Sequence, residues 1–136
     1  MSSGILVPEQ FIVSTLTGDA TLMGMITKVY EAPADKPTGV YITFARMRPG
    51  TDVSVVAGNI VFTNELYQVA VHKQTNDYND ILPAFERVHT LLHLAEGTVS
   101  QGRVLRCRRI NTITQKGVED NLPYRKLGGL YQIYVQ

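Results

Sequence analysis

Residues Asp80 to Ala95 read DILPAFERVHTLLHLA, and this stretch decides how the rest of the chain is arranged. Its apolar side chains recur at the spacing of one helix face, at Ile81, Phe85, Val88, Leu92 and Ala95. Proline inside a helix costs about 3 kcal/mol, but with Asp80 as N-cap, Pro83 takes the third helical position, where no backbone hydrogen bond is lost. We therefore predict one major amphipathic helix over 80–95, stopped by Gly97.

Stretches rich in apolar and β-branched residues on both sides of this helix predict strands. The expected strands are Lys28–Glu31, Val40–Met47, Ile60–Lys73, Thr98–Ile110 and Gly129–Val135. In the third strand Leu66 breaks the alternation that follows it, and a bulge near Glu65 would restore it. Two helices are expected before the first strand: residues 8–16, opened by Pro8, and a shorter helix capped by Asp19.

Two polar, turn-rich segments are expected to lie outside the core. Residues 48–59 could form a hairpin arm or a mobile loop, and residues 111–128 a long loop. In the last strand, Tyr131, Ile133 and Val135 share one face and are expected to be buried against the major helix. This order predicts an α+β fold with a mainly antiparallel sheet, and one long and one or two short helices packed on one face, in a single domain over residues 1–136.

Composition and charge narrow the classes of function. With 136 residues, 44% of them hydrophobic and 18% charged, the chain has the composition of a globular domain, and its net charge of +1 gives no overall attraction to DNA or membranes. The single cysteine, Cys107, excludes an internal disulfide and a multi-cysteine zinc site, and favours a cytosolic environment. No signal peptide and no apolar run of about 20 residues is found, so neither secretion nor a membrane span is expected.

Basic residues concentrate in one part of the chain. The stretch RVLRCRRI, residues 103–110, places four arginines in a predicted strand. Alternation puts Leu105 and Cys107 on the core side and turns Arg106 and Arg108 to the opposite face. Residues 103–126 hold seven basic and two acidic side chains, whereas the rest of the chain holds six basic and ten acidic ones. A chain with such asymmetry can associate head to tail with its own copies.

Other interpretations of these residues stay open. The arginines could form a solvated sheet face, or bind nucleic acid, although no helix-turn-helix, zinc finger or aromatic RNA-binding motif accompanies them. For an enzyme, His89 and His93 lie one helical turn apart, yet there is no HExxH motif and no obvious third ligand. Cys107 has no nucleophile motif around it. We therefore expect no catalytic residue, no metal and no cofactor.

Five stretches of the chain resemble the tail terminator, or tail completion, proteins of long-tailed bacteriophages. They are DATLMGMITKVY (19–30), GVYITFARM (39–47), NELYQVAVHKQTNDYNDILPAFERVHTLL (64–92), GRVLRCRRI (102–110) and YRKLGGLYQIYVQ (124–136). The resemblance spans nearly the full chain, and it rests on patterns of fold rather than on catalytic signatures. Residues 51–59 fit the pattern least.

The resemblance implies a non-enzymatic virion protein that forms a homo-oligomeric ring, expected to be hexameric, at the head-proximal end of the tail tube. Such a ring would stop tube polymerisation, contact the major tail tube protein and a head connector or completion protein, and let packaged DNA pass through its lumen without sequence recognition. Residues expected at an interface or the lumen are Arg46, Arg48, Arg106, Arg108, Lys116, Arg125 and Lys126. The alternatives are a head completion protein of the neck or a small nucleic-acid-binding module.

Overall fold

Most of the described chain is strand. A computed structural model describes residues 6–32, 39–54, 60–100, 102–119 and 121–136. Within these ranges the helices are α1 (Leu6–Thr17), α2 (Ala20–Met23) and α3 (Leu82–Leu92), with a 3₁₀ turn, η1, at Tyr78–Asp80. The strands are β1 (Val29–Glu31), β2 (Tyr41–Ser54), β3 (Ile60–Lys73), β4 (Ala95–Val99), β5 (Gly102–Glu119) and β6 (Leu122–Val135).

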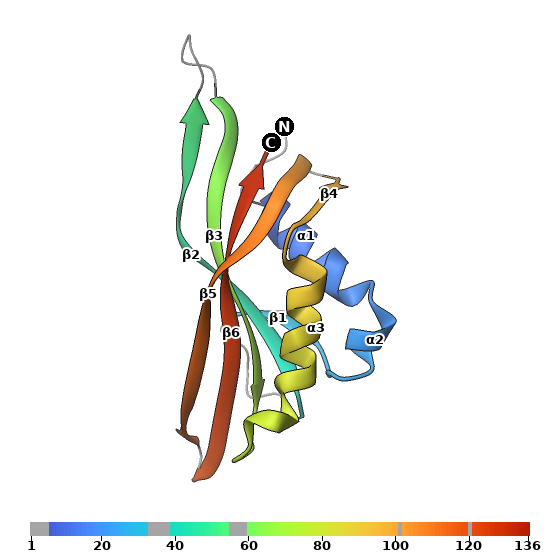
Figure 1. Ribbon diagram of the computed structural model, residues 1–136, viewed down its shortest axis with the longest axis vertical. Helices are drawn as coiled ribbons and strands as arrows, with labels where there is room; N and C mark the ends of the chain where they lie inside the picture. The colour runs from blue at the N-terminus through green and yellow to red at the C-terminus, as the bar shows by residue number, and fades with distance from the viewer. Residues whose placement is uncertain (1–5, 33–38, 55–59, 101, 120) are drawn as a thin grey trace.

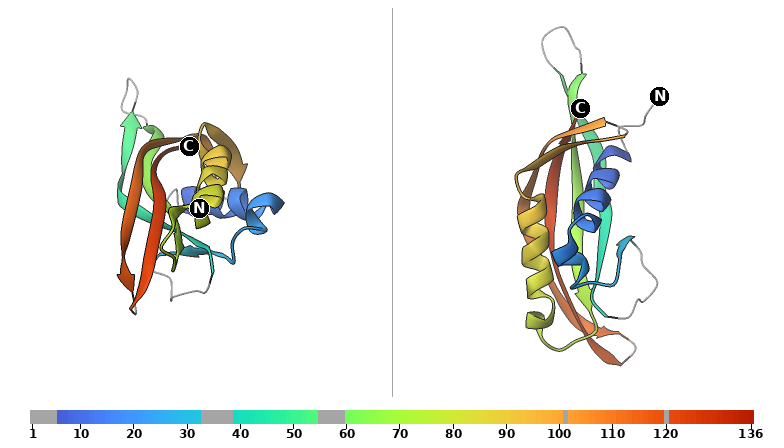
Figure 2. Two further views of the ribbon diagram at one scale, coloured as in Figure 1. Left: turned by 60° about the horizontal axis from the view of Figure 1, so that its bottom comes forward. Right: turned by 90° about the vertical axis from the view of Figure 1, so that its right-hand side faces the viewer.

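The strands form one sheet in the order β1-β2-β3-β6-β5-β4. This sheet curls into a half-barrel, and the helices lie on its concave side (Figures 1 and 2). β1 runs parallel to β2, with Val29 opposite Ile42, while the other neighbouring strands pair antiparallel. The helices therefore cover one face of the sheet and leave its convex face free.

The predicted fold class, an α+β fold with a mainly antiparallel sheet and one long helix, is wrong. The chain is mostly β, its sheet is mixed and curled, and α1 and α3 are of similar length, at 12 and 11 residues. The alternation of apolar residues shows which face of a sheet a side chain occupies, but it contains no information on the direction of the neighbouring strand. Nothing in residues 28–31 could therefore mark them as a parallel edge strand.

The first two helices follow from local sequence. α1 is followed by Gly18, where an added Cβ would lie only 2.8 Å from the Ser14 carbonyl oxygen. Asp19 then caps α2 by accepting a hydrogen bond of 2.9 Å from the Leu22 amide, which confirms the predicted cap. Glycine and aspartate together thus separate two helices that the apolar pattern alone would run into one.

The major helix is shorter than predicted. Ile81, not Asp80, is the N-cap of α3, and Pro83 lies in its first turn, where proline costs little. Asp80 ends η1 instead, and its carboxylate accepts a hydrogen bond from the Thr75 hydroxyl. The helix ends at Leu92, and Leu94, with φ of 63°, turns the chain into β4 before Gly97 is reached.

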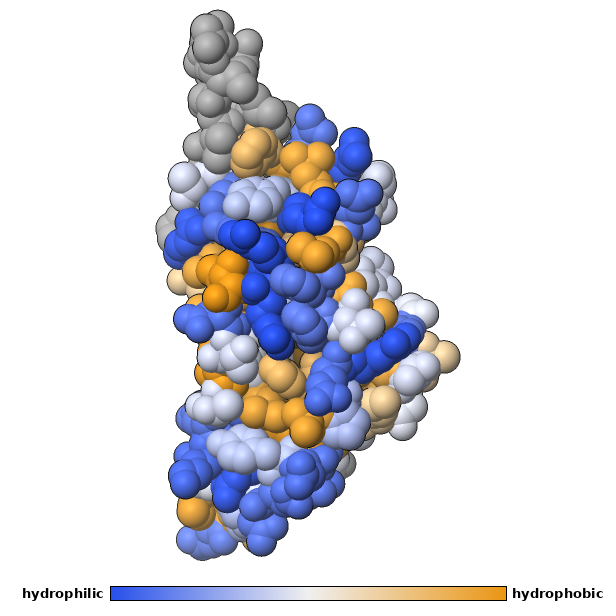
Figure 3. Space-filling view, in the orientation of Figure 1, coloured by the Kyte–Doolittle hydropathy of each residue, from blue (hydrophilic) through white to orange (hydrophobic). Residues whose placement is uncertain are grey.

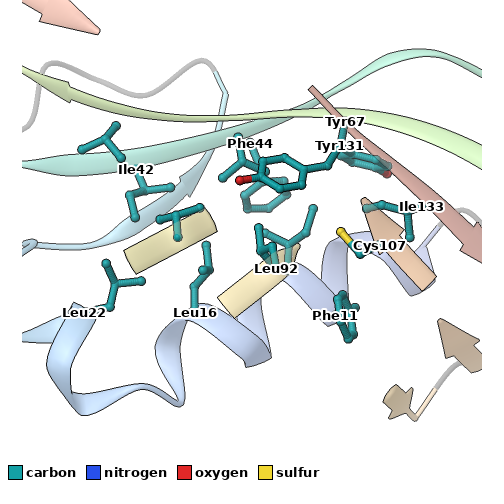
Figure 4. Close-up of a cluster of buried hydrophobic side chains, with 14 of the residues drawn as sticks. Phe11, Leu16, Leu22, Ile42, Phe44, Tyr67, Leu92, Cys107, Tyr131 and Ile133 are labelled. Carbon is teal, nitrogen blue, oxygen red and sulfur yellow. The ribbon is translucent and has the colours of Figure 1, made fainter. Parts of the chain in front are cut away.

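The core lies between the concave face of the sheet and the inner sides of the helices (Figure 4). Its fully buried members include Ile12, Leu16, Leu22, Ile42, Tyr67, Ile81, Leu92 and Cys107. Tyr131, Ile133 and Val135 of β6 are also buried, as predicted. Because β6 pairs with β3 on one side and β5 on the other, this final strand lies in the middle of the sheet.

β3 alternates without interruption. Its residues Thr63 to Lys73 pair one by one with β6, so the bulge predicted near Glu65 is absent from this ladder. Extra residues lie in the facing strand β2 instead, at Met47 and again between Arg48 and Thr51. Leu66 is on the convex face, whereas Glu65 points to the concave side with only 2% of its surface exposed. A charge buried to this extent requires a partner.

The arginine-rich strand contains two bulges. Leu105 is an extra residue between Val104, which faces Val135, and Arg106. Val104 and Cys107 consequently fill the core, so the predicted inward position is confirmed for Cys107 and wrong for Leu105. A second extra residue, at position 110, lies between Arg109 on the concave side and Asn111 on the convex side. The predicted strand over 98–110 is also divided, because β4 and β5 form a hairpin.

Two long hairpins project from opposite ends of the sheet (Figure 1). At one end β2 continues to Ser54 beside β3, so the described part of 48–59 is a hairpin arm. At the other end the β5–β6 ladder runs without a bulge from Asn111 and Leu130 to Glu119 and Leu122. The predicted long loop over 111–128 is therefore wrong. We call residues 111–130 the lower arm.

Candidate assembly surfaces

The convex face of the sheet is basic. The strand registers place Arg48, Arg106, Arg108 and Lys126 on it. Its outward positions within 41–48, 64–72, 106–115 and 126–134 hold no aspartate or glutamate. Arg108 donates a hydrogen bond of 3.1 Å to Gln132, and the Tyr134 hydroxyl donates to the same oxygen at 3.0 Å. Arg106 and Arg108 are exposed, so this face offers fixed positive charge to whatever meets it.

A buried histidine lies at the lower end of the same face. The Nε2 atom of His72 is 2.7 Å from the Thr43 hydroxyl, Nδ1 is hydrogen-bonded to the Tyr124 hydroxyl, and the ring stacks on Tyr41 at 4.9 Å. Burial, with a smaller contribution from the charge of Lys126, lowers the pKa of His72 to about 4. His72 is therefore neutral at pH 7, and its hydrogen bonds connect Tyr124, which pairs with Gly117 in the outer part of the lower arm, to Thr43 of β2.

The concave side of the lower arm carries a second basic group. Lys73, Arg125 and Lys116 lie directly opposite one another on β3, β6 and β5. The Arg125 guanidinium lies 5.5 Å from the centre of the Tyr78 ring and donates to the Asn76 carbonyl at 3.3 Å. Like charges at opposed positions repel, and among the described residues no carboxylate forms an ion pair with these three.

The other end of the concave side is acidic. The Arg46 guanidinium donates two hydrogen bonds to the Glu65 carboxylate, of 3.0 Å from Nε and 3.1 Å from Nη2. The carboxyl groups of Glu9 and Glu31 share a hydrogen bond, and burial followed by the charge of Glu31 raises the pKa of Glu9. Glu9, Glu31 and Glu65, the acidic cluster, thus surround one cation and keep an excess of negative charge.

An open groove of about 730 Å³ lies beside this cluster. It runs between α1 and the two edge strands of the sheet, which the curl brings toward each other (Figure 2). Glu9 and Glu31 supply its acidic wall, and Val13, Phe44 and Val99 supply its apolar lining. The groove can therefore accept a ligand that is partly apolar and partly cationic.

Other charged residues serve the packing of the helices. The Arg87 guanidinium of α3 donates to both carboxylate oxygens of Asp19, at 2.9 and 2.7 Å, and holds the pKa of Asp19 at about 2. Arg109 lies over the Phe85 ring at 5.3 Å, and its amide donates to His93. Arg109 therefore belongs to the helix interface, unlike Arg106 and Arg108, which lie on the convex face.

The candidate catalytic residues have the properties of structural ones. Cys107 is fully buried, and burial raises its pKa to about 12, which disfavours the nucleophilic thiolate. His89 and His93 stack on each other at 4.7 Å instead of converging on one point. Across the described ranges no three His, Cys, Asp or Glu side chains are grouped to hold a metal ion. None of the described helices has the length and apolar character needed to cross a membrane.

The seven basic residues predicted from the sequence do not form one surface. Four lie on the convex face, Lys116 and Arg125 lie on the concave side of the lower arm, and Arg46 lies within the acidic cluster. Sequence reasoning missed the acidic cluster. Only Glu65 carried a signal, because it lies in phase with the buried residues of β3 and so marks a buried charge.

Comparison with known proteins adds a likeness in fold. No protein-family model matches the chain, and no curated protein matches it. A solved chain from the virion of a native gene transfer agent particle is similar over 91% of this chain and 90% of that chain, with 21% identity and a TM-score of 0.72. A second solved structure matches over 91% of this chain and 94% of that chain, with 13% identity and a TM-score of 0.51. At this level of identity the likeness establishes the fold.

Proposed function

We propose that this chain is a virion structural protein that closes the head-proximal end of a phage tail tube as a hexameric ring. The observation that carries the proposal is the similarity in fold, over 91% of the chain, to a protein of a gene transfer agent virion. The sequence resemblance to tail terminator proteins narrows that role to the end of the tail. One face of the ring would meet the major tail tube protein, and the other the head connector.

The distribution of charge supports self-association. A closed ring of identical subunits with one repeated contact needs two different surfaces that fit each other. The basic convex face and the acidic cluster lie on opposite sides of the curled sheet, so neighbouring copies can present unlike charges. Any part of the basic face left toward the lumen would attract the DNA backbone without reading its sequence.

The role we propose is structural and not catalytic. The only cysteine is buried with a raised pKa, and the histidines pack against each other and against neighbouring strands. Such residues hold surfaces in place, and they present no reactive group to a substrate.

Deletion of the gene from the intact virus tests the proposal. Particles that lack the protein should contain tail tubes of uncontrolled length without attached heads, and the purified protein should form six-membered rings by electron microscopy. Tails of normal length next to heads that fail to retain DNA would favour a head completion protein. A purified protein that forms no rings, together with normal virions after deletion, would reject both functions.

A further inference from the structure

The lower arm exposes apolar and basic side chains on one side. The registers place Val118 and Pro123 opposite each other near its tip, and Lys116 and Arg125 opposite each other two residues further in, all on the concave side. Val118 has 75% of its surface exposed, the largest fraction among the exposed large hydrophobic residues of the described chain. This side of the arm is therefore apolar at its tip and basic behind it.

The arm projects from the molecule, so its own chain leaves Lys116, Val118 and Pro123 exposed and covers only part of Arg125, through Asn76 and Tyr78. Figure 1 shows the hairpin of β5 and β6 extending past α3 and past the end of β3, and Figure 3 shows apolar residues at the lower end among hydrophilic ones. An exposed hairpin with apolar side chains is an aggregation risk unless it has a partner. The partner should offer an apolar surface next to negative charge.

The groove beside α1 offers both. Val13, Phe44 and Val99 form its apolar lining, and the hydrogen-bonded pair of Glu9 and Glu31 forms its acidic wall. Arg46 is already engaged by Glu65, so a further cation from outside would offset the excess negative charge. A volume of about 730 Å³ also falls within the range of roughly 300 to 1,000 Å³ typical of binding pockets.

We propose that the lower arm of one copy docks in the α1 groove of the next copy. Val118 and Pro123 then contact the apolar lining, and Lys116 faces Glu31. Arm and groove lie on different parts of the molecule, so the contact is head to tail and every copy uses each surface once. The inference rests on the proposed self-association and identifies the contact that produces it.

Charge exchange between the two surfaces tests this contact. Glu31→Lys and Lys116→Glu should each weaken self-association of the full chain at least tenfold in sedimentation analysis, because each places like charges together. The double variant should associate within about threefold of wild type, because opposite charges again meet. Glu86→Lys and Lys28→Glu, which reverse exposed charges outside both surfaces, serve as matched controls and should leave association unchanged.

A tip variant gives a second, independent test. Replacing residues 118–123 with Asn-Gly closes the hairpin on the Gly117–Tyr124 pair and retains the contact of Tyr124 with His72. This variant should keep the wild-type circular dichroism spectrum and fail to associate.

The outcomes separate this inference from the proposed function. The arm-in-groove contact would be overturned if the tip variant still formed rings like those of wild type. It would also be overturned if the double charge variant associated no more strongly than the single variants. Either result would leave the proposed ring itself in place. A wild-type chain that stays monomeric at all concentrations, alone and with tail tubes, would overturn both.

Discussion

Among single residues, Glu65 shows most clearly how a buried charge is kept. Its side chain is 3% exposed and its carboxylate pairs with Arg46, whose own side chain is 30% exposed. We expect Arg46→Met to lower the free energy of unfolding by about 2 to 4 kcal/mol, because it leaves a buried carboxylate without a partner. Glu65→Gln should cost less, since the arginine can turn to solvent.

Urea denaturation measures these differences. Arg48→Met is the control, because Arg48 lies half-buried on the convex face of the same strand and its guanidinium donates a hydrogen bond to the Thr51 hydroxyl; it should change stability by no more than about 0.5 kcal/mol. Equal losses for Arg46→Met and Arg48→Met would show that the pair with Glu65 contributes nothing to stability.

His72 makes stability depend on pH. Its pKa of about 4 in the folded protein lies below the unfolded value of about 6.5, so the unfolded chain takes up the proton first as pH falls. Neutral His72 therefore contributes on the order of 3 kcal/mol to the free energy of unfolding above pH 6.5, and this contribution is lost as pH falls from 6.5 to 4. Melting temperature should therefore fall over this window.

The matched variant is His72→Gln. The melting temperature of this variant should not show the fall between pH 6.5 and 4 that His72 causes. The difference from wild type separates the effect of His72 from that of Glu9, whose raised pKa stabilises the folded protein as pH falls. Parallel curves for the two proteins between pH 7 and 4 would contradict the assignment.

At the scale of elements, alternation and capping predicted most strands and helices but not how they meet. Three features could be predicted because each depends on residues that are close in sequence: the strand over 60–73, the cap at Asp19 and the buried face of β6. The parallel pairing of β1 and the bulges at Met47 and Leu105 depend on the facing strand, which the local pattern does not contain.

The lower arm was mistaken for a loop for a physical reason. Outside its base at 127–130, most of its side chains are exposed on both faces, so the alternation that marks a half-buried strand is missing. The candidate surfaces were likewise predictable only in part. Clustering in sequence revealed Arg106 and Arg108, whereas Glu9, Glu31 and Glu65 come together only when the sheet curls around α1.

The central position of β6 predicts a severe effect of truncation. Deleting residues 131–136 removes Tyr131, Ile133 and Val135 and separates β3 from β5 over the upper half of the sheet. Each buried side chain contributes about 1.5 to 3 kcal/mol, against a typical total stability of roughly 5 to 15 kcal/mol. The truncated chain should unfold or aggregate.

Solubility and circular dichroism measure this outcome. Deleting Gln136 alone, which removes only its two backbone hydrogen bonds with Arg103, is the control and should leave a folded protein. A soluble six-residue truncation with the wild-type melting temperature would show that the end of the chain is a free extension.

The lower arm should be the least protected part of the sheet in the free subunit. Its ladder has exposed residues on both faces, whereas residues 127–135 of β6 are largely covered by helices. Hydrogen exchange should therefore be faster at 112–118 than at 131–135 in the monomer, and should slow at 112–118 on assembly. Equal protection of the arm before and after assembly would rule out its burial.

For the whole molecule, the basic convex face should matter to assembly and not to folding. Arg106 and Arg108 are exposed, so reversing both to glutamate should leave the circular dichroism spectrum unchanged. The same variant should weaken the ring or its joint with the tube, most strongly at low salt. A normal yield of infectious particles would show that these arginines are merely solvated.

The single thiol allows the rate at which the subunit opens to be measured. Cys107 is the only cysteine of the chain, and it is shielded from solvent in the folded subunit, so a maleimide can reach it only after the sheet opens. With excess reagent the labelling rate equals the opening rate, and no engineered reporter is needed. Comparing the labelling rates of free and assembled subunits would then show how much assembly slows this opening.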